Sequence, residues 1–286
     1  MRDNMYLYQI QLHKGRDMSN SIKDTICERK SVRTFDGRKI TAEDKSKLEE
    51  IIRTADNPFG VPVDFMLLDA KENGLSSPVI VGCELYLAAK VKRVKHYELA
   101  FGYSFEKLCL LAHTLGLGTV MLAASLNRAA FENAINVQAD EVMPVASPVG
   151  YPANKKSIRE SRMRKGLKAD ERLPFEKLFF ENDFSRSLSN GSTFSESLQM
   201  ARLAPSAGNK QPWRAVVIDD TVHFYEYKTM KDSPLGDIQK VDMGIALSHF
   251  DLTEKENGHS GRFAQLDPQL DLPENTHYII SYERTE

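Results

Sequence analysis

The chain lacks the features that mark several common classes of protein. It has three cysteines among 286 residues, with no metal-ligand spacing, so neither a disulfide framework nor a metal site is indicated. Its formal net charge of -2 gives no reason to expect nucleic acid or a membrane surface as a partner. No apolar run is long enough to span a bilayer, and no signal-peptide segment opens the chain. The composition therefore favours a soluble cytoplasmic protein with buried free thiols at Cys27, Cys83 and Cys109.

One stretch that is present, residues 204–213, joins a helical pattern at 194–203 to an apolar run at 215–218. Pro205 ends the helix, because proline cannot extend the α pattern and restricts the residue before it. The small residues that follow let the backbone approach a flat group, while Asn209 and Gln211 supply hydrogen-bond donors and acceptors. Taken alone, this composition is typical of an ordinary loop.

A second stretch, Arg29-Lys30-Ser31-Val32-Arg33-Thr34-Phe35, follows a short amphipathic segment at residues 22–27. It holds three cations and a hydroxyl within five residues. In an extended chain Arg29, Ser31 and Arg33 would point the same way, which suits a phosphate monoester. An isolated cluster of this kind is more often a solvated surface.

Together, and in this order, the two stretches resemble the nitroreductase family of FMN-dependent oxidoreductases. In that family an R-x-S-x-[RK] segment holds the FMN phosphate and ribityl chain, and a P-S-x-x-N-x-Q-P-W loop from the other half of a dimer lies against the flavin ring. The resemblance implies that FMN is bound by Arg29, Lys30, Ser31, Arg33, Pro205, Ser206, Ala207, Asn209 and Gln211.

The resemblance also implies two further contacts with FMN. Relatives present backbone groups to the flavin near the position of Leu122, Ala123 and Ala124, where the family commonly has Glu-Gly. A basic pair that follows the strand predicted at 143–151 reaches back to the phosphate in relatives, and Arg162 and Arg164 are the candidates here.

Local patterns predict several other elements. Thr41 is a good N-cap for a helix that ends at Ala55, and residues 99–115 form the longest apolar helical pattern in the chain. A shorter helix is expected at 127–134, and strands at 65–68, 78–82 and 143–151. The strongly basic segment 154–172 is interpreted mostly as a solvated linker.

The chain also repeats itself internally. With a shift of 150 positions Pro62 falls on Pro212, and the strand at 65–68 falls on 215–218. Further on, Gly102 corresponds to Gly244, and the strand at 278–282 matches the one at 145–151. We therefore expect an α+β, nitroreductase-like fold with two pseudo-symmetric halves, each a mainly antiparallel sheet flanked by helices. The expected boundaries are an N-terminal arm at 1–17, a first half at 18–170 and a second half at 171–286.

The two copies of the motifs are not equivalent. Glu181 and Asp183 stand where the first copy has its phosphate-binding cations, and carboxylates repel a phosphate. Asp56 stands where the second copy has Ser206. The sequence thus predicts one composite flavin site per chain, in a monomer that acts as an intrachain pseudo-dimer.

The function implied by the resemblance is NADH- or NADPH-dependent reduction of a small acceptor, such as a nitroaromatic or a quinone. No catalytic side chain is expected, because the flavin carries the chemistry and the protein supplies position and access. Two alternatives stay open. One is a flavin-binding relative with non-reductase chemistry or a storage or trafficking role, and the other is a structural protein that has lost the flavin.

Overall fold

The computed structural model describes residues 21–285. The predicted arm at residues 1–17 lies outside this range. In chain order the elements are α2 (Ile22–Glu28), α3 (Ala42–Arg53), β1 (Val63–Asp69), β2 (Leu85–Lys92), α4 (Tyr97–Thr114), β3 (Gly118–Thr119), α5 (Arg128–Ala134), β4 (Glu141–Val142), β5 (Ala146–Gly150), α6 (Ile158–Gly166), η1 (Phe175–Lys177), β6 (Phe179–Glu181), α7 (Ser195–Arg202), η2 (Ala207–Asn209), β7 (Trp213–Ile218), β8 (Thr221–Tyr227), α8 (Ile238–Glu256), β9 (Ser260–Ala264) and β10 (Thr276–Thr285).

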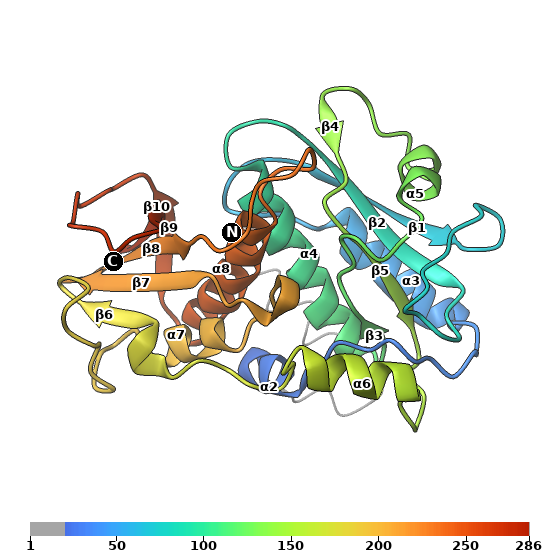
Figure 1. Cartoon of the computed structure of the whole chain (residues 1–286), viewed down its shortest axis with the longest axis horizontal. Helices are drawn as coiled ribbons and strands as arrows, with labels where there is room; N and C mark the ends of the chain where they lie inside the picture. Colours follow the sequence, from blue (N-terminus) through green and yellow to red (C-terminus); the bar gives the residue numbers. More distant parts are fainter. Residues whose placement is uncertain (1–20, 286) are drawn as a thin grey trace.

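These elements form two five-stranded sheets at opposite ends of the molecule, with the long helices α4 and α8 between them (Figure 1). The first sheet has the order β1-β2-β5-β3, with β4 paired to β2, and the second has the order β6-β7-β8-β10-β9. Strands β6 and β7 run parallel, and the other paired strands are antiparallel. The predicted α+β class, with two mainly antiparallel sheets flanked by helices, is confirmed.

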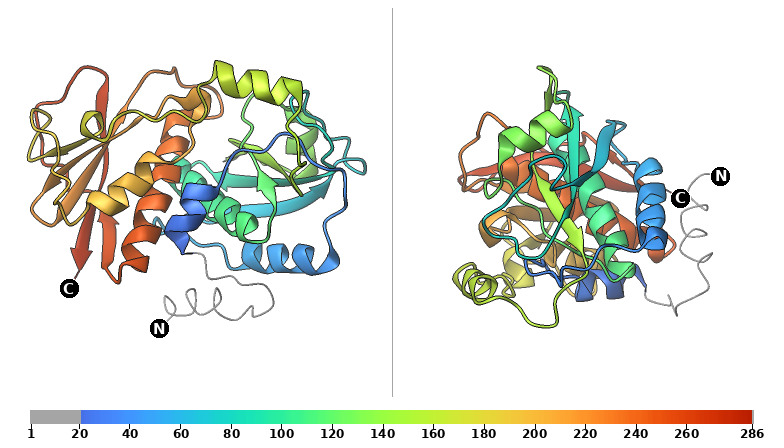
Figure 2. Two further views of the ribbon diagram at one scale, coloured as in Figure 1. Left: turned by 90° about the horizontal axis from the view of Figure 1, so that it is seen from below. Right: turned by 90° about the vertical axis from the view of Figure 1, so that its right-hand side faces the viewer.

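The two halves repeat one succession of elements. Figure 2 shows the two halves from below and from one end. A helix, a hairpin, a long helix and two returning strands follow one another as α3, β1, β2, α4, β3, β5 and again as α7, β7, β8, α8, β9, β10. The strand order β1-β2-β5-β3 in one sheet matches β7-β8-β10-β9 in the other. The first half carries α5 and β4 in addition, between β3 and β5.

The long helices touch through two glycines. A Cβ atom added to Gly102 would lie 2.0 Å from the carbonyl oxygen of Val241, and one added to Gly244 would lie 2.2 Å from that of Leu99. The contact is reciprocal, because Leu99 and Gly102 are spaced along α4 as Val241 and Gly244 are along α8. A surface that packs on its own counterpart is what a two-fold interface requires. In this protein both surfaces belong to one chain.

Several sequence predictions hold at the level of single elements. The hydroxyl of Thr41 accepts a hydrogen bond from the N–H of Asp44 at 3.1 Å and caps α3. The predicted long apolar helix is α4, which is buried on nearly every face. The predicted strands at 65–68, 215–218 and 278–282 lie within β1, β7 and β10.

Other predictions are wrong. Residues 78–82 form no strand, because Pro78 has no N–H to give to a ladder and Gly82 turns the chain with a φ of 73°. The second strand of the first sheet is β2, which sequence reasoning missed. The basic segment 154–172 contains α6, capped where the hydroxyl of Ser157 accepts from the N–H of Glu160 at 3.1 Å. The strand predicted at 143–151 is shorter and spans only β5.

The cysteines are free, as predicted, but they are not all buried. Cys109 is buried in α4 and Cys83 is partly buried, whereas Cys27 lies on the exposed side of α2. None of the helices in the described part of the chain combines the length and apolar character that crossing a membrane requires.

Candidate functional site

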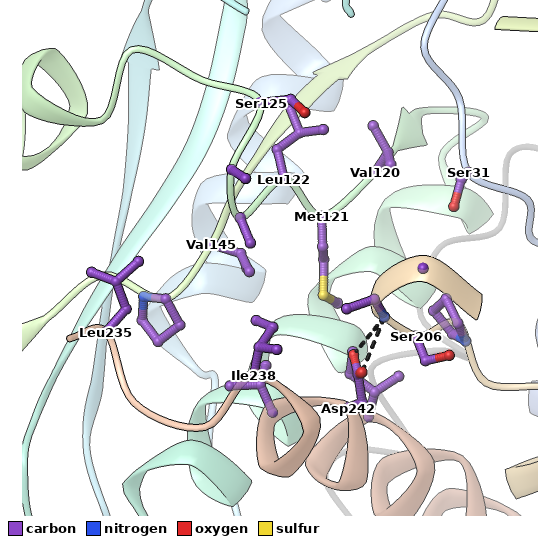
Figure 3. Close-up of a pocket in the computed structure, with 18 of the residues that line it drawn as sticks. Ser31, Val120, Met121, Leu122, Ser125, Val145, Ser206, Leu235, Ile238 and Asp242 are labelled. Atoms are coloured by element: carbon purple, nitrogen blue, oxygen red, sulfur yellow. Dashed lines mark hydrogen bonds between the residues drawn. The ribbon is translucent and has the colours of Figure 1, made fainter. Parts of the chain in front are cut away.

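A cavity of about 650 Å³ lies beside α4 and α8 and is lined by residues of both halves. Its walls are largely apolar. Met121, Leu122 and Val145 come from the first half, and Ser206, Leu235 and Ile238 from the second (Figure 3). A volume of this size suits a cofactor or a small ligand.

The basic segment after α2 runs along this cavity in extended form. The N–H of Val32 donates to the carbonyl of Thr119 at 2.9 Å, and the N–H of Phe35 donates to that of Val81 at 2.8 Å. Because side chains alternate along an extended chain, Arg29, Ser31 and Arg33 share one side, and all three line the cavity.

A smaller cavity of about 190 Å³ adjoins the first and shares these three residues with it. Five cations line it: Arg29, Lys30, Arg33, Arg164 and Arg172. The buried Nε and Nη1 of Arg33 and Nε of Arg172 have no hydrogen-bond partner within residues 21–285. Buried donors are normally paired, so these groups indicate the place of an anionic ligand.

The position of Arg29 is fixed by a buried chain of contacts that crosses the molecule. Its Nε lies 3.0 Å from Oε1 of Glu106 in α4, and Nε2 of His249 in α8 lies 2.9 Å from the same oxygen. Nδ1 of His249 lies 3.0 Å from the carbonyl oxygen of Met200. The side chains of Glu106 and His249 are fully buried. Residues from three separate segments therefore orient the Arg29 guanidinium.

Two other basic residues of the smaller cavity, Arg164 and Arg172, are held by hydrogen bonds to carbonyl and carboxylate oxygens of the protein. Nη1 of Arg164 donates to the carbonyl of Ser31 at 3.2 Å, and its Nη2 pairs with Asp170. Arg172 donates to several carbonyls, among them that of Leu203 at 3.1 Å. Burial, the largest cause, lowers the pKa of Arg172, and neighbouring Arg29 adds to this. The guanidinium still stays charged, because the pKa of arginine starts far above neutrality.

The wall at Leu122–Ala124 is rigid. The backbone of Leu122 exchanges both of its hydrogen bonds with Ala146, at 2.8 and 3.1 Å. Arg128 donates to the carbonyls of Ala123 at 2.5 Å and Met143 at 2.6 Å. In the described chain the N–H groups of Ala123 and Ala124 have no partner, and both residues line the cavity.

The loop after α7 closes another side of the cavity. The hydroxyl of Ser206 accepts from the N–H of Gln211 at 2.9 Å, and the N–H of Ala207 donates to both carboxyl oxygens of Asp242, at 3.1 and 3.0 Å. The side-chain amide of Asn209 donates to the carbonyl of Lys168 at 2.8 Å. These contacts tie the loop both to α8 and to the segment after α6.

Most of the residues predicted to bind the cofactor lie together. Arg29, Ser31, Arg33, Leu122, Ala123, Ala124, Pro205, Ser206 and Ala207 line the larger cavity, and Lys30, Arg164 and Asn209 line the smaller one. Gln211 and Arg162 line neither cavity. Gln211 is buried, and its Oε1 accepts from the N–H of Leu173 at 2.8 Å, while Arg162 is exposed on α6.

Sequence reasoning missed other residues of the site, namely Glu106, Arg128, Arg172 and Asp242. One signal was present for two of them. Glu106 and Asp242 are acidic residues within otherwise apolar helical patterns, and a buried carboxyl needs a special reason. Arg172 was indistinguishable from its neighbours in the basic run.

Comparisons with known proteins identify the family and support the fold. A family model described as "Putative TM nitroreductase" matches residues 21–254. A crystal structure from Thermotoga maritima, described as a "putative nitroreductase", has a TM-score of 0.63 and 20% identity, and the match covers 96% of this chain and 97% of that one. No curated protein gives a match.

Shorter structures match about half of this chain. An FMN-dependent nitroreductase from Clostridium difficile R20291 has a TM-score of 0.40 and 16% identity, over 48% of this chain and 92% of its own. An iodotyrosine deiodinase bound to FMN and 3-iodo-L-tyrosine has a TM-score of 0.39 and 18% identity, over 48% and 92%.

Proposed function

The chain belongs to this nitroreductase family, and we propose that it is an FMN-dependent oxidoreductase that uses NADH or NADPH to reduce a small acceptor such as a nitroaromatic or a quinone. The observation that carries the proposal is the paired cavity, apolar in its larger part and cationic in its smaller part. FMN has the same two-part character, with a flat ring system at one end and a phosphate at the other.

The cationic part fits a phosphate. Arg33 has two buried N–H donors without a partner in the described chain, and Ser31 adds a hydroxyl on the same side. Burial lowers the pKa of Arg33, but the pKa of arginine starts far above neutrality, so the group stays charged at neutral pH. Charge-assisted hydrogen bonds to a dianion would supply the missing partners.

The apolar part fits the ring. Leu122 and Ile238 offer apolar surface on opposite walls, and the N–H groups of Ala123 and Ala124 offer donors for polar atoms at a ring edge. Pro205, Ser206 and Ala207 add a small-residue wall that lets a planar group come close. Bound FMN would supply the hydride and electron transfer, while these residues bind it, orient it and exclude water.

The proposed assembly is a monomer with one FMN between its two halves, 18–170 and 171–286. Two features support this. The cavity already has walls from both halves, and the reciprocal contact of Gly102 and Gly244 is made within one chain. A second subunit is therefore not needed to complete the site.

The test is a visible spectrum of the purified protein, loaded with FMN and then mixed anaerobically with NADPH or NADH. We expect one FMN per chain, tighter binding of FMN than of riboflavin, and loss of the oxidised flavin absorbance with either or both nucleotides. Light scattering should give the mass of one chain. A protein that binds neither flavin overturns the proposal. Flavin that binds but is never reduced by either nucleotide points instead to the flavin-binding relative with other chemistry.

A further inference from the structure

The carboxyl group of Asp242 lies in the apolar floor of the larger cavity. Asp242 belongs to the first turns of α8, and Figure 3 shows its side chain rising toward the loop that carries Ser206. Val241, Ile238 and Ile245 line the cavity around it. Asp242 is only 3% exposed, so an ionised carboxylate there would be almost without water.

Within residues 21–285 no cation compensates this carboxyl. Both of its oxygens accept from one N–H, that of Ala207, and no lysine, arginine or histidine of the described chain forms an ion pair with it. Burial, the largest cause, raises the pKa of Asp242 well above its usual value. The Ala207 N–H opposes this, and the charges of Asp237 and Glu226 add to it. The carboxyl therefore holds a proton under conditions where most aspartates have lost theirs.

Two further acidic residues, Glu226 and Asp237, act on Asp242 through their charges. Glu226 is 1% exposed, its Oε1 has no partner in the described chain, and burial raises its pKa to about 7. Nearby Asp237 adds to this rise in the pKa, and Asp237 pairs with Nζ of Lys228 at 2.7 Å. Lys228 also contacts the exposed Asp232 at 2.6 Å. Glu226 and Asp237, whose charges act on Asp242, thus lie next to an ion pair that reaches the exposed Asp232.

We propose that Asp242, recharged through Glu226 and Asp237, donates to a substrate in the cavity the proton that accompanies its reduction. This inference rests on the proposed flavin-dependent function. A quinone becomes a hydroquinone by gaining two electrons and two protons. A hydride delivers both electrons and one proton. The second proton passes from the carboxyl oxygen of Asp242 to a quinone oxygen and leaves a carboxylate, which then takes a proton from solvent by way of Asp237 and Glu226.

The other charged groups around the cavity are Arg29, Arg33, Glu106, Arg128 and Lys231. The arginines stay protonated at neutral pH, and Glu106 contacts Arg29 and His249. Lys231 lies in the loop before α8 and lines the cavity beside Met230 and Ser233. A general acid works best when it can both hold and release its proton near the operating pH, which favours Asp242.

The first experiment needs no flavin. Carbon-13 NMR of the apo protein, labelled at aspartate carboxyl carbons, follows each titration. We expect one resonance that titrates well above the ordinary aspartate range and is missing in Asp242→Asn. The matched control is Asp251→Asn, which removes another buried aspartate of α8 that lines neither cavity. If the resonance lost in Asp242→Asn titrates in the ordinary range, the proposal is overturned.

The second experiment separates proton supply from loop support, since the side-chain amide in Asp242→Asn can still accept the Ala207 N–H through its oxygen. In FMN-loaded protein, reduced beforehand, reoxidation by benzoquinone requires protons, whereas reoxidation by ferricyanide takes electrons alone. We expect Asp242→Asn to slow the benzoquinone reaction at least about tenfold, because general acids commonly contribute more than this, and to leave the ferricyanide reaction unchanged. Equal slowing with both acceptors, or no slowing, overturns the proposal. Wild-type protein that reduces neither acceptor overturns the proposed function instead.

Discussion

The flavin-sized cavity and its pseudo-symmetric counterpart are filled in different ways. Ile245 lines the cavity, whereas the residue at the same place in α4 is Tyr103. Met121 lines it after α4, whereas Phe263 stands at that place after α8. The counterpart loop contributes Phe59, whose ring lies 6.0 Å from that of Tyr103 and 5.5 Å from that of Phe263. Aromatic rings thus occupy the place that a flavin ring would need.

Two acidic residues of the second half, Asp242 and Glu226, have apolar counterparts in the first half. Asp242 corresponds to Ala100 of α4, which is fully buried. Glu226 pairs with Trp213 in β8 and β7, and the equivalent pair in β2 and β1 is Val91 with Val63. The same backbone arrangement therefore forms a cavity in one position and a packed core in the other. A few side chains determine which of the two is formed.

The largest expected effect comes from disrupting the glycine contact between α4 and α8. In Gly102→Val and in Gly244→Val, the new side chain would clash with the facing carbonyl group. Each variant should therefore lose about 3 kcal/mol or more of unfolding free energy. Urea unfolding measures both losses. Similar values would show that the contact is symmetric in energy as well as in geometry, and a variant with wild-type stability would contradict this packing.

The aromatic filling of the counterpart can be tested by Phe59→Ala. We expect a loss of about 2–4 kcal/mol in unfolding free energy, because Phe59 packs against both cores and leaves a gap when truncated. Flavin stoichiometry should remain one per chain, since Glu181 and Asp183 still stand on the phosphate side. Binding of a second FMN by this variant would show that the rings alone keep the counterpart empty of ligand.

The phosphate contact gives a smaller, more selective effect. Arg33→Ala should weaken FMN binding by about 1.5–3 kcal/mol, the range for hydrogen bonds to charged groups, and should weaken riboflavin binding much less. The matched control is Asp183→Ala at the corresponding position of the second half, which should leave both affinities unchanged. Isothermal titration calorimetry measures all of them. Equal losses for FMN and riboflavin would contradict the assignment of Arg33 to the phosphate.

The buried carboxyl group of Glu226 should make the stability of the protein depend on pH. The pKa of Glu226 is raised from 4.5 to about 7 by burial and by Asp237. Between these two pH values the carboxyl group is therefore ionised in the unfolded chain but still protonated in the folded chain. The contribution of protonated Glu226 to the free energy of unfolding is fully present below pH 4.5. It falls as the pH rises and is lost above about pH 7. Glu226→Gln should remove this pH dependence, which amounts to about 2–3 kcal/mol in the difference between the unfolding free energies at pH 5 and at pH 8. If this difference is the same in Glu226→Gln as in the wild-type protein, Glu226 does not titrate in this pH range.

The sequence reveals the parts of the site that depend on local order. Arg29, Ser31 and Arg33 alternate within one segment, and Pro205 to Asn209 form one loop, so the order of residues along the chain was enough to locate each set. Asp242 and Glu226 could not be assigned, because their meaning depends on which apolar residues surround them in space. The same limit applies to β2, which was missed, and to α6, whose basic residues hid its cap at Ser157.

The glycine contact between α4 and α8 also has a genetic consequence. In a dimer of identical subunits one codon specifies both sides of such an interface, so every substitution appears twice and both sites change together. Here Gly102 and Gly244 are encoded separately, as are Tyr103 and Ile245. A mutation that fills one place with an aromatic ring leaves the other place untouched. The two sides of this molecule are therefore free to be selected for different purposes, one for packing and one for chemistry.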